Sequence, residues 1–346
     1  MRLYHYAALL MLSCLNAIYS GNHNFAGAER VRPCKCEISR ADALAITLPR
    51  KMNSSFTSPK VAIILLNWHG WRDTIACLNS LTSLNYENYS ILVVDNGSTD
   101  ESVANIRAAH PNVPIIETGR NLGFSGGCNV GIRRSLDAAA DYIWLLNNDT
   151  VVACQALVAM VATAEADPKI GAVGSVLYFL HNRSDIQAWG GGRISFLSGR
   201  SYHYIKPVPN ADIQYLTGAS ILLRRRALEE VGLLEEKLFF MYWEDADLSF
   251  RLRKAGWHLA VADRSVVFHK ENGSTGKANP LIDYYFSESA IRFFRRHAEI
   301  WLWPVAISVF GRLAKRVLRN NLRGFVATLR GTYSGMKAKD DGCISR

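Results

Sequence analysis

The first part of the chain alternates unbroken apolar runs with segments of helical periodicity. Apolar runs such as VAIILL at residues 61–66 and ILVV at 91–94 are typical of strands that are buried on both faces. We expect strands at residues 61–66, 91–94, 113–116 and 142–146, and helices at 71–84 and 124–140. Because strand and helix alternate every ~25–30 residues, the pattern predicts an open parallel α/β sheet.

Polar residues follow three of these strands at the point where each strand ends. They are Asn67, Asp95 and the run Asn147-Asn148-Asp149. Ligands of open α/β sheets bind beyond the carboxyl ends of the strands, so we expect these side chains to converge on one site. Taken alone, Asp149 could instead cap a helix, because Asn-Asn-Asp-Thr is also good capping sequence.

The second half of the chain adds further strands and an acidic cluster. We expect strands at 171–179, 215–223 and 265–268, a glycine-rich loop at 189–199 and a helix at 248–256. The cluster Glu244-Asp245-Ala246-Asp247 precedes that helix, and alone it could be a solvated helix start, where acids suit the helix dipole. Together with Asp149 it could supply a divalent-metal ligand and a general base. His269 is a candidate second ligand, although a lone histidine is more often structural.

The N-terminal 58 residues do not continue the alternating pattern. The apolar run from Ala7 to Ile18 lies behind Arg2 and resembles a secretory signal, but it is too short to cross a membrane and lies far from a small-residue cleavage site. We therefore expect residues 1–58 to be an extension or linker, with Met52 as the start of the working protein. The seven cysteines are scattered without a zinc or disulfide pattern, which suits a reducing cytoplasm.

Positive charge is concentrated near the C-terminus. The formal net charge is +10, and the stretch from Arg292 to Arg330 holds nine lysines and arginines against the single acid Glu299. From Gly311 onward these alternate with apolar residues at helical spacing, as in an interfacial membrane helix. The alternative is an ordinary helix with a solvated basic face. No nucleic-acid-binding motif accompanies the charge, so we expect no nucleic-acid partner.

Several motifs in fixed order carry a family resemblance. They are Asn67, Val-Val-Asp95-Asn-Gly-Ser-Thr-Asp100, the run from Asn121 to Gly131, Leu-Asn-Asn-Asp149-Thr, Thr217-Gly218-Ala219, Glu244-Asp245-x-Asp247 and His269. Over roughly residues 60–270 this set resembles the large family-two group of inverting GT-A glycosyltransferases, and its rhamnosyltransferase-like branch most of all.

The resemblance implies a fold and a role for each motif residue. It implies a three-layer α/β GT-A domain over residues 59–285, followed by a basic amphipathic helical tail over 286–346. Asp245 would be the catalytic base with Glu244 beside it, and Asp149 and His269 would hold Mg²⁺ or Mn²⁺. Asp95 would bind the nucleotide base. The remaining donor-binding residues would be Asn67, Asn121, Gly123, Asn129 and Asn148, and the acceptor side would hold Thr217, Gly218 and Asp247.

The family also implies partners and a place of action. The donor would be a nucleotide-diphosphate sugar, which in the rhamnosyltransferase-like branch would be rhamnose, and the acceptor a glycan or a lipid-linked glycan in cell-surface polysaccharide assembly. Because that donor is a cytoplasmic metabolite, we expect the protein in the cytoplasm, at the inner face of the cell membrane, with peripheral contact through the basic tail.

Two positions depart from the family pattern. Asn147 stands where the Asp-x-Asp element has its first aspartate, and Tyr284-Tyr285 is followed by Phe-Ser-Glu288 where related chains often carry Arg-Asn. Asn147 favours the alternative that the chain is a catalytically degenerate relative that binds nucleotide sugars or glycans, whereas the intact Glu244-Asp245 opposes it. A nucleotidyltransferase is disfavoured, because no basic glycine-rich phosphate loop follows the first strand.

Overall fold

The computed structural model describes residues 58–270 and 279–337. Within them a nine-stranded sheet has the order β3-β2-β1-β4-β11-β6-β12-β5, with β7 paired to β6. Its strands are β1 Val61–Asn67, β2 Tyr89–Asp95, β3 Ile115–Glu117, β4 Tyr142–Asn147, β5 Thr150–Val152, β6 Ile170–Phe179, β7 Ile186–Trp189, β11 Ser220–Arg224 and β12 His258–His269. A second sheet of order β10-β8-β9 contains β8 Gly191–Ser195, β9 Arg200–His203 and β10 Tyr215–Leu216.

The main sheet is mixed rather than wholly parallel. Strands β1 to β4 pair in parallel, as the alternation of strand and helix predicts. However, β11 runs antiparallel to both β4 and β6, and β5 runs antiparallel to β12. The parallel arrangement predicted from the first half of the chain therefore holds for β1 to β4, whereas in the second half short turns rather than crossover helices precede the antiparallel strands.

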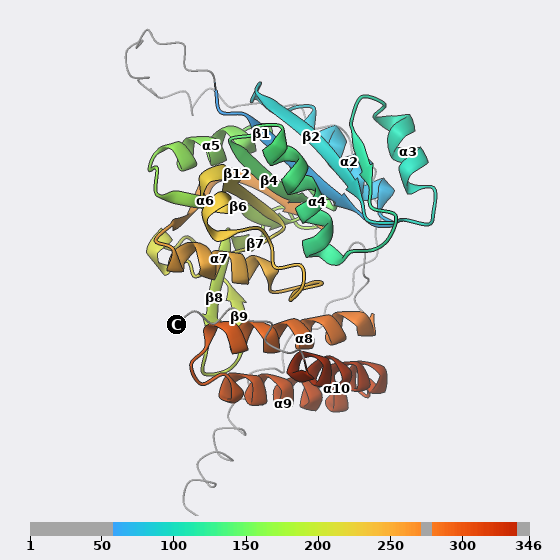
Figure 1. The fold of residues 1–346 in the computed structure, drawn as a ribbon, viewed down its shortest axis with the longest axis vertical. Coiled ribbons are helices and arrows are strands. Elements are labelled where there is room, and N and C mark those ends of the chain that lie inside the picture. The colour runs from blue at the N-terminus through green and yellow to red at the C-terminus, as the bar shows by residue number, and fades with distance from the viewer. Residues whose placement is uncertain (1–57, 271–278, 338–346) are drawn as a thin grey trace, which may run out of the picture. The chain divides into compact units, whose positions relative to one another are not determined.

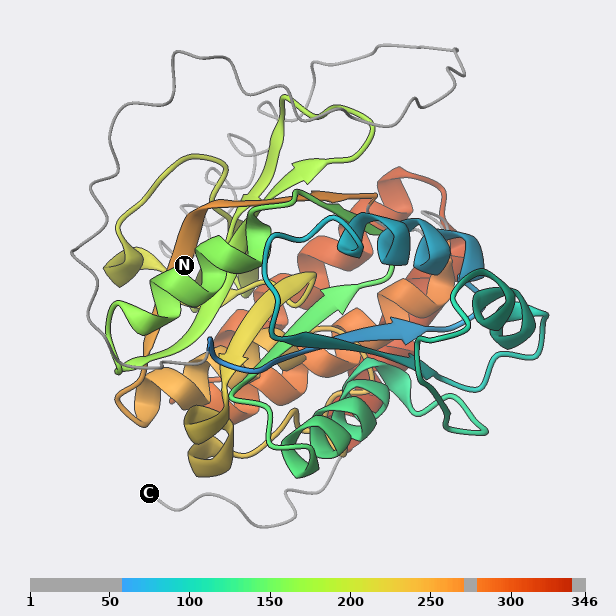
Figure 2. The same ribbon diagram turned by 90° about the horizontal axis from the view of Figure 1, so that it is seen from above.

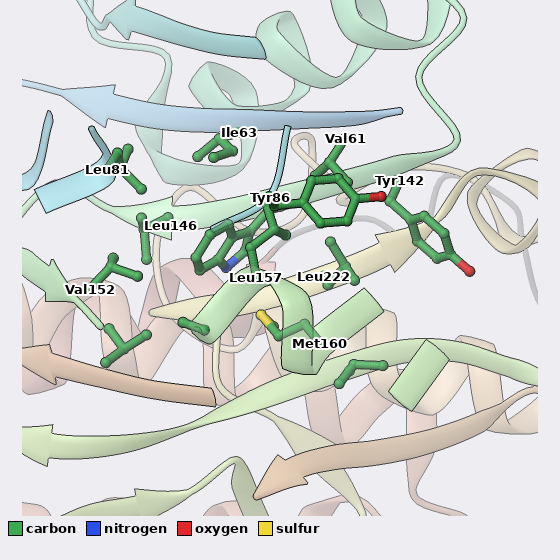
Figure 3. Close-up of a cluster of buried hydrophobic side chains, with 14 of the residues drawn as sticks. Val61, Ile63, Leu81, Tyr86, Tyr142, Leu146, Val152, Leu157, Met160 and Leu222 are labelled. Atoms are coloured by element: carbon green, nitrogen blue, oxygen red, sulfur yellow. The ribbon is translucent and has the colours of Figure 1, made fainter. Parts of the chain in front are cut away.

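Helices cover both faces of the main sheet, which gives the three layers expected from the sequence (Figures 1 and 2). On one face α2 Trp71–Leu81, α3 Ser102–Ala109 and α5 Ala156–Glu165 join one apolar core, and on the other α4 Gly123–Asp137, α6 Arg225–Val231 and α7 Glu244–Lys254 join a second. Figure 3 shows the first core, where Leu157 and Met160 of α5 lie against side chains of the sheet such as Val152 and Leu222.

Two segments of the second half differ from their predicted structure. Residues 189–199, expected as a glycine-rich loop, include β8, which pairs with β9 in a hairpin. The expected strand 215–223 is divided between β10 and β11, because the turn at Thr217–Ala219 moves the chain from the small sheet to the large one. Helix α7 begins at Glu244 rather than at residue 248, so the acidic cluster forms its first turn.

The C-terminal helices are α8 Pro280–His297, α9 Leu302–Leu318 and α10 Leu322–Lys337. Figure 1 shows α8 next to α7, with α9 and α10 beyond it. Helix α8 is continuous across the expected domain boundary at residue 285, and its Phe293 and Phe294 pack on Trp243 in a third, aromatic core. The amphipathic stretch 311–330 was expected as one helix but spans the end of α9 and the start of α10, with a turn at Asn320.

The expectations for residues 1–57, including Met52 as the start, fall outside the described residues. In the two described ranges, no helix is both long enough and apolar enough to cross a bilayer.

Candidate active site

A cavity of about 520 Å³ lies beyond the carboxyl ends of β1, β2 and β4 and extends to α8. Nine of the predicted site residues line it. They are Asn121, Gly123, Asn148, Asp149, Thr217, Gly218, Glu244, Asp245 and, from the end of β12, His269. Strand ends that are distant in the sequence therefore meet in one place, as parallel strands with a common carboxyl edge require.

The carboxylate of Asp245 is fixed by backbone donors at the first turn of α7. The N–H of Gly218 donates to Oδ2 at 2.8 Å, and the N–H of Ala246 donates to Oδ1 at 2.7 Å. Two backbone hydrogen bonds stabilise the ionised form of a carboxylate.

The backbone before Asp245 is held in an unusual conformation. Tyr242 and Trp243 both have φ of +70°, in the left-handed region that non-glycine residues rarely adopt. Consecutive left-handed residues cost free energy and persist only when the surrounding packing fixes them. Here Trp243 is 5% exposed and packs against Phe286, Phe293 and Phe294 of α8. The strained turn sets the direction in which Glu244 and Asp245 enter the cavity.

Glu244 and Asp245 have contrasting surroundings. Glu244 is 7% exposed, and its Oε2 has no hydrogen-bond partner in the described part of the chain. Burial, with a further contribution from the charge of Asp245, raises the pKa of Glu244 well above its ordinary value. Burial also raises the pKa of Asp245, but its backbone donors and the nearby His203 act against that rise. Of the two, Asp245 is the better placed to ionise first, with Glu244 keeping its proton.

A second group of candidate ligands lies where β4 and β12 end. His269 Nε2 lies 3.2 Å from Asp149 Oδ1 and 3.4 Å from Asn147 Nδ2. The other ring nitrogen, Nδ1, is 2.8 Å from Oε1 of Gln187 on β7, which fixes the orientation of the imidazole. Among the described residues, no set of three or more His, Cys, Asp and Glu side chains is placed to hold a metal ion.

The end of the cavity near β1 and β2 is built from amides. Asn96 donates to Asn121 Oδ1 and to the carbonyl of Gly123, while its own Oδ1 accepts from the N–H of Leu122. Gly123 has φ of +76°, and a Cβ there would lie 2.3 Å from the carbonyl oxygen of Phe240, so only glycine suits this position. Asn148 donates to the hydroxyl of Thr74.

Four predicted site residues lie outside the cavity lining. Asn67 and Asp95 are buried and joined by a 2.8 Å hydrogen bond, and Ser98 donates to both oxygens of Asp95 through its backbone and hydroxyl. Asn129 holds the segment after α6 through Leu234. These three side chains shape the walls around the cavity.

The fourth residue, Asp247, faces away from the cavity toward α8. It is fully buried and is contacted by Arg251, Arg296 and His297 at 2.8, 3.4 and 2.8 Å. Asp247 therefore connects α7 to α8 and does not line the cavity.

Several lining residues were not predicted. Trp68 and Asn96 follow β1 and β2, Ser201 and His203 come from β9, and Phe286 comes from α8. Ser201 and His203 alternate along their strand, a period-two signal that would have been available had 189–203 been assigned as a hairpin. The departure at Tyr284-Tyr285 brings Phe286 to the cavity, whereas Glu288 pairs with Arg292 at 2.7 Å and accepts from Ser334 of α10.

The segment that forms most of this cavity is similar in sequence to a known protein family. The sequence model described as Glycosyl transferase family 2 matches residues 61–232. The chain carries a glycosyl transferase family 2 domain. This domain of the glycosyltransferase contains the motifs from Asn67 to Asp149, and Glu244, Asp245 and His269 lie beyond the matched segment on the same cavity.

Curated relatives of the glycosyltransferase are similar over much of its length. The N-acetylglucosaminyl-diphospho-decaprenol L-rhamnosyltransferase of Mycobacterium tuberculosis is 29% identical over 274 residues, covering 71% of this chain and 89% of the relative. The low-salt glycan biosynthesis hexosyltransferase Agl10 of Haloferax volcanii is 26% identical, covering 56% of this chain and 62% of the relative.

Solved structures share the fold. The mannosyltransferase PcManGT from Pyrobaculum calidifontis, in complex with GDP-Man and Mn²⁺, aligns with a TM-score of 0.54 over 82% of this chain and 88% of its own, at 14% identity. GalNAc-T7 with UDP, GalNAc and Mn²⁺ aligns with a TM-score of 0.59 over 82% and 55%, also at 14% identity. The expected GT-A fold is confirmed.

Proposed function

We propose that this glycosyltransferase is an inverting enzyme that moves a sugar from a nucleotide-diphosphate donor to a hydroxyl group of a lipid-linked glycan. The observation that carries the proposal is the carboxylate of Asp245, which lines the cavity and is aligned by the N–H groups of Gly218 and Ala246. A general base must reach the acceptor proton with a fixed geometry, and Asp245 meets that requirement.

The reaction is a single displacement. Asp245 accepts the proton of the acceptor hydroxyl while that oxygen forms a bond to the anomeric carbon of the donor sugar. The bond from the anomeric carbon to the diphosphate breaks, and the nucleoside diphosphate leaves with the electron pair. Attack opposite to the leaving group inverts the sugar configuration. Glu244, kept protonated by burial, leaves a single negative charge on the pair.

Asp149 and His269 are the residues that would hold a divalent metal. A metal such as Mg²⁺ or Mn²⁺, when bound, supplies positive charge to the departing diphosphate. With Nδ1–H donating to Oε1 of Gln187, neutral His269 would present the lone pair of Nε2 to a metal held between it and Asp149. Two protein ligands suit a metal that takes its other ligands from phosphate oxygens and water. Asn147 supplies an amide instead of a second carboxylate.

The donor would lie at the end of the cavity that Asn121, Gly123 and Asn148 form, and the acceptor at the end near Thr217 and Gly218. The Mycobacterium tuberculosis relative bears the name of an L-rhamnosyltransferase that acts on N-acetylglucosaminyl-diphospho-decaprenol. By this similarity we propose a rhamnose donor and a lipid-linked acceptor in polysaccharide assembly. We propose that the enzyme works at the cytoplasmic inner face of the cell membrane.

Membrane contact would be made by α9 of the basic tail. Trp303, Ile307 and Phe310 expose 55%, 36% and 60% of their surface on its outward side. Large exposed apolar side chains on an amphipathic helix with basic neighbours favour an interfacial position on anionic lipid.

A catalytically degenerate binding protein is the second candidate, favoured by Asn147 in place of a metal-binding carboxylate. Release of the nucleoside diphosphate from a panel of nucleotide sugars, with Mn²⁺, Mg²⁺ or EDTA, separates the two. We expect slow, metal-dependent release from one donor. The absence of release, together with a failure of every donor to raise the unfolding temperature, would support the degenerate relative.

The Asp245→Asn variant tests the assignment of the base. Transfer should fall by about 10²–10⁴-fold, the usual contribution of a general base, while donor affinity is retained. Asp263→Asn is the matched control, since Asp263 is exposed on β12 outside the cavity. Transfer that survives in Asp245→Asn would disprove the role of Asp245.

A further inference from the structure

Positive charge gathers where the β8–β9 turn meets α9. A Cβ on Gly199 would lie 2.1 Å from the carbonyl oxygen of Pro304, so the turn rests directly on α9. About two turns further along this side of the helix, a Cβ on Gly311 would lie 3.3 Å from Nη2 of Arg200. Lys315 follows one turn later on the same side. The hairpin and the helix thus place Arg200 and Lys315 at the same junction.

Arg312 completes this group, which we name the junction cluster: Arg200, Arg312 and Lys315. The neighbouring Arg316 is already neutralised by Asp283 of α8. Within residues 58–270 and 279–337, no carboxylate forms an ion pair with any member of the junction cluster. The junction therefore carries an excess of uncompensated positive charge.

The cationic side chains of the junction affect one another. Burial lowers the pKa of Lys315, and the charges of Arg319, Arg316, Arg312 and Arg200 lower it further. Burial likewise lowers the pKa of Arg312 to about 10, with Arg316 and Arg200 adding to the effect and Asp283 opposing it. Cations that repel one another in a partly buried place are stabilised in their charged form by a bound anion.

A single aromatic ring connects the cluster to the active-site cavity. The guanidinium carbon of Arg312 lies 3.8 Å from the ring centroid of Phe286, and Phe286 lines the cavity. That ring also packs on Tyr242 and Trp243, the residues directly before Glu244-Asp245. Phe286 therefore separates the cluster from the cavity by one ring and links it to the two aromatic residues that precede the proposed base.

Apolar surface continues from the cluster along α9. Trp303, Ile307 and Phe310 are exposed on the outward side of the helix, so a hydrocarbon chain could lie next to the cationic groups. A sugar acceptor at Asp245, an anionic group at the junction and a hydrocarbon on α9 would form one continuous path.

We infer that Arg200, Arg312 and Lys315 bind the diphosphate group of a lipid-linked acceptor. This inference rests on the proposed function, and it adds the site that would distinguish a diphosphate-linked acceptor from a free glycan. Arginine suits the site because its planar guanidinium forms paired hydrogen bonds with phosphate oxygens.

The test uses the full chain and dodecyl diphosphate in neutral detergent micelles without metal or donor. The Arg200→Gln/Lys315→Gln variant should bind dodecyl diphosphate about tenfold more weakly than the parent, as expected for the loss of charge-assisted contacts. Arg323→Gln/Arg330→Gln is the matched control with the same change in charge, on exposed positions of α10, and should keep the parent affinity. An unchanged unfolding temperature of each variant shows that it is folded.

Two results would overturn the inference. One is an equal loss of affinity in the test and control variants, which would indicate general charge attraction. The other is a test variant that binds phosphatidylglycerol vesicles more weakly but keeps its affinity for dodecyl diphosphate, which would make the cluster a site for membrane headgroups. Since binding is measured without a sugar, its failure is separate from a failure of donor hydrolysis in the parent protein.

Discussion

At the scale of single residues, the contrast between Glu244 and Asp245 is the most informative feature of the site. Two adjacent carboxylates cannot both ionise freely in a buried place. Backbone N–H groups favour the charge on Asp245, while Oε2 of Glu244 is left without a partner. Replacing Glu244 therefore removes an acid that destabilises the folded protein whenever it is ionised.

The Glu244→Gln variant should change how stability depends on pH. Since the pKa of Glu244 is raised by folding above its ordinary 4.5, its contribution to stability is complete below pH 4.5 and is lost as the pH rises through the folded-state pKa. The variant does not lose stability through ionisation at position 244, although ionisation of Asp245 still lowers its stability as the pH rises. Between low and high pH, the free energy of unfolding of Glu244→Gln should rise by about 1–3 kcal/mol relative to that of the parent.

Urea unfolding at pH 4.5 and pH 8.5, without metal or donor, measures this difference. Glu87→Gln, at an exposed glutamate, is the control, and its free energy of unfolding should change with pH as that of the parent does. If the free energies of unfolding of the parent and of Glu244→Gln also change equally between the two pH values, Glu244 does not hold a proton in the folded state.

The sequence predicts some of these residues better than others. Asp149, Glu244, Asp245 and His269 each stand at a motif position. The carboxyl edge of the sheet brings Asp149 and His269 together, and the first turn of α7 adds Glu244 and Asp245. Gln187 has no local signal, because its role depends on the pairing of β7 with β6 and on the position of His269 at the end of β12. Asp247 has the same acidic character as its neighbours, but helical geometry turns it to the opposite side of α7.

At the scale of helices and strands, Asp247 joins α7 to α8 and so fixes one wall of the site. Burial acts to raise the pKa of Asp247, but the hydrogen bond with His297 and the charges of Arg251 and Arg296 lower it below its ordinary 3.8. A lowered pKa means that this stabilisation is present above pH 3.8 and is lost as the pH falls through the folded-state value.

The Asp247→Asn variant leaves buried cations without their counter-charge and should lower the free energy of unfolding by about 3–5 kcal/mol at pH 7. The deficit should shrink below pH 3.8. Urea unfolding checks both statements, with Asp263→Asn as the exposed control. Because Asp247 lies outside the cavity, turnover per folded molecule should stay within about twofold of the parent value. A loss of turnover without a matching loss of folded protein would indicate that Asp247 takes part in acceptor binding.

The elements themselves were predictable where local pattern decides them. Strands β1, β2 and β4 contain continuous apolar runs, so their burial was evident from the sequence. The hairpin of β8 and β9 was missed because glycines at 190–192 suggest a loop, whereas the structure uses them for close contact: a Cβ on Gly191 would lie 1.9 Å from the carbonyl oxygen of Tyr215. The direction of β11 depends on the turn at Thr217–Ala219, which apolar periodicity does not encode.

At the scale of the whole enzyme domain, the C-terminal helices close the site from the side of α8 and expose a different face on α9. Phe286 reaches the cavity from α8, and Ser289 donates to the carbonyl of Met241 next to the strained turn. Phe286 also contacts Arg312 of α9, so it connects that helix with the cavity. If α9 lies on a membrane, the sugar of a lipid-linked glycan would reach Asp245 while its lipid stays in the bilayer.

This arrangement predicts that vesicle binding depends on Phe310 and not simply on surface hydrophobicity. Burying a phenylalanine side chain in the interface contributes about 1.5–3 kcal/mol, so Phe310→Glu should weaken binding to anionic vesicles by about tenfold or more. Ile205→Glu is the matched control, since Ile205 and Phe310 are both 60% exposed and Ile205 lies after β9, outside the C-terminal helices.

Co-sedimentation with phosphatidylglycerol vesicles at two salt concentrations measures both variants. Binding by the parent should also weaken with salt, because the basic residues contribute through screened charge. Equal losses in the two variants would show that α9 is not the membrane-facing element, and the path from bilayer to Asp245 would have to be abandoned.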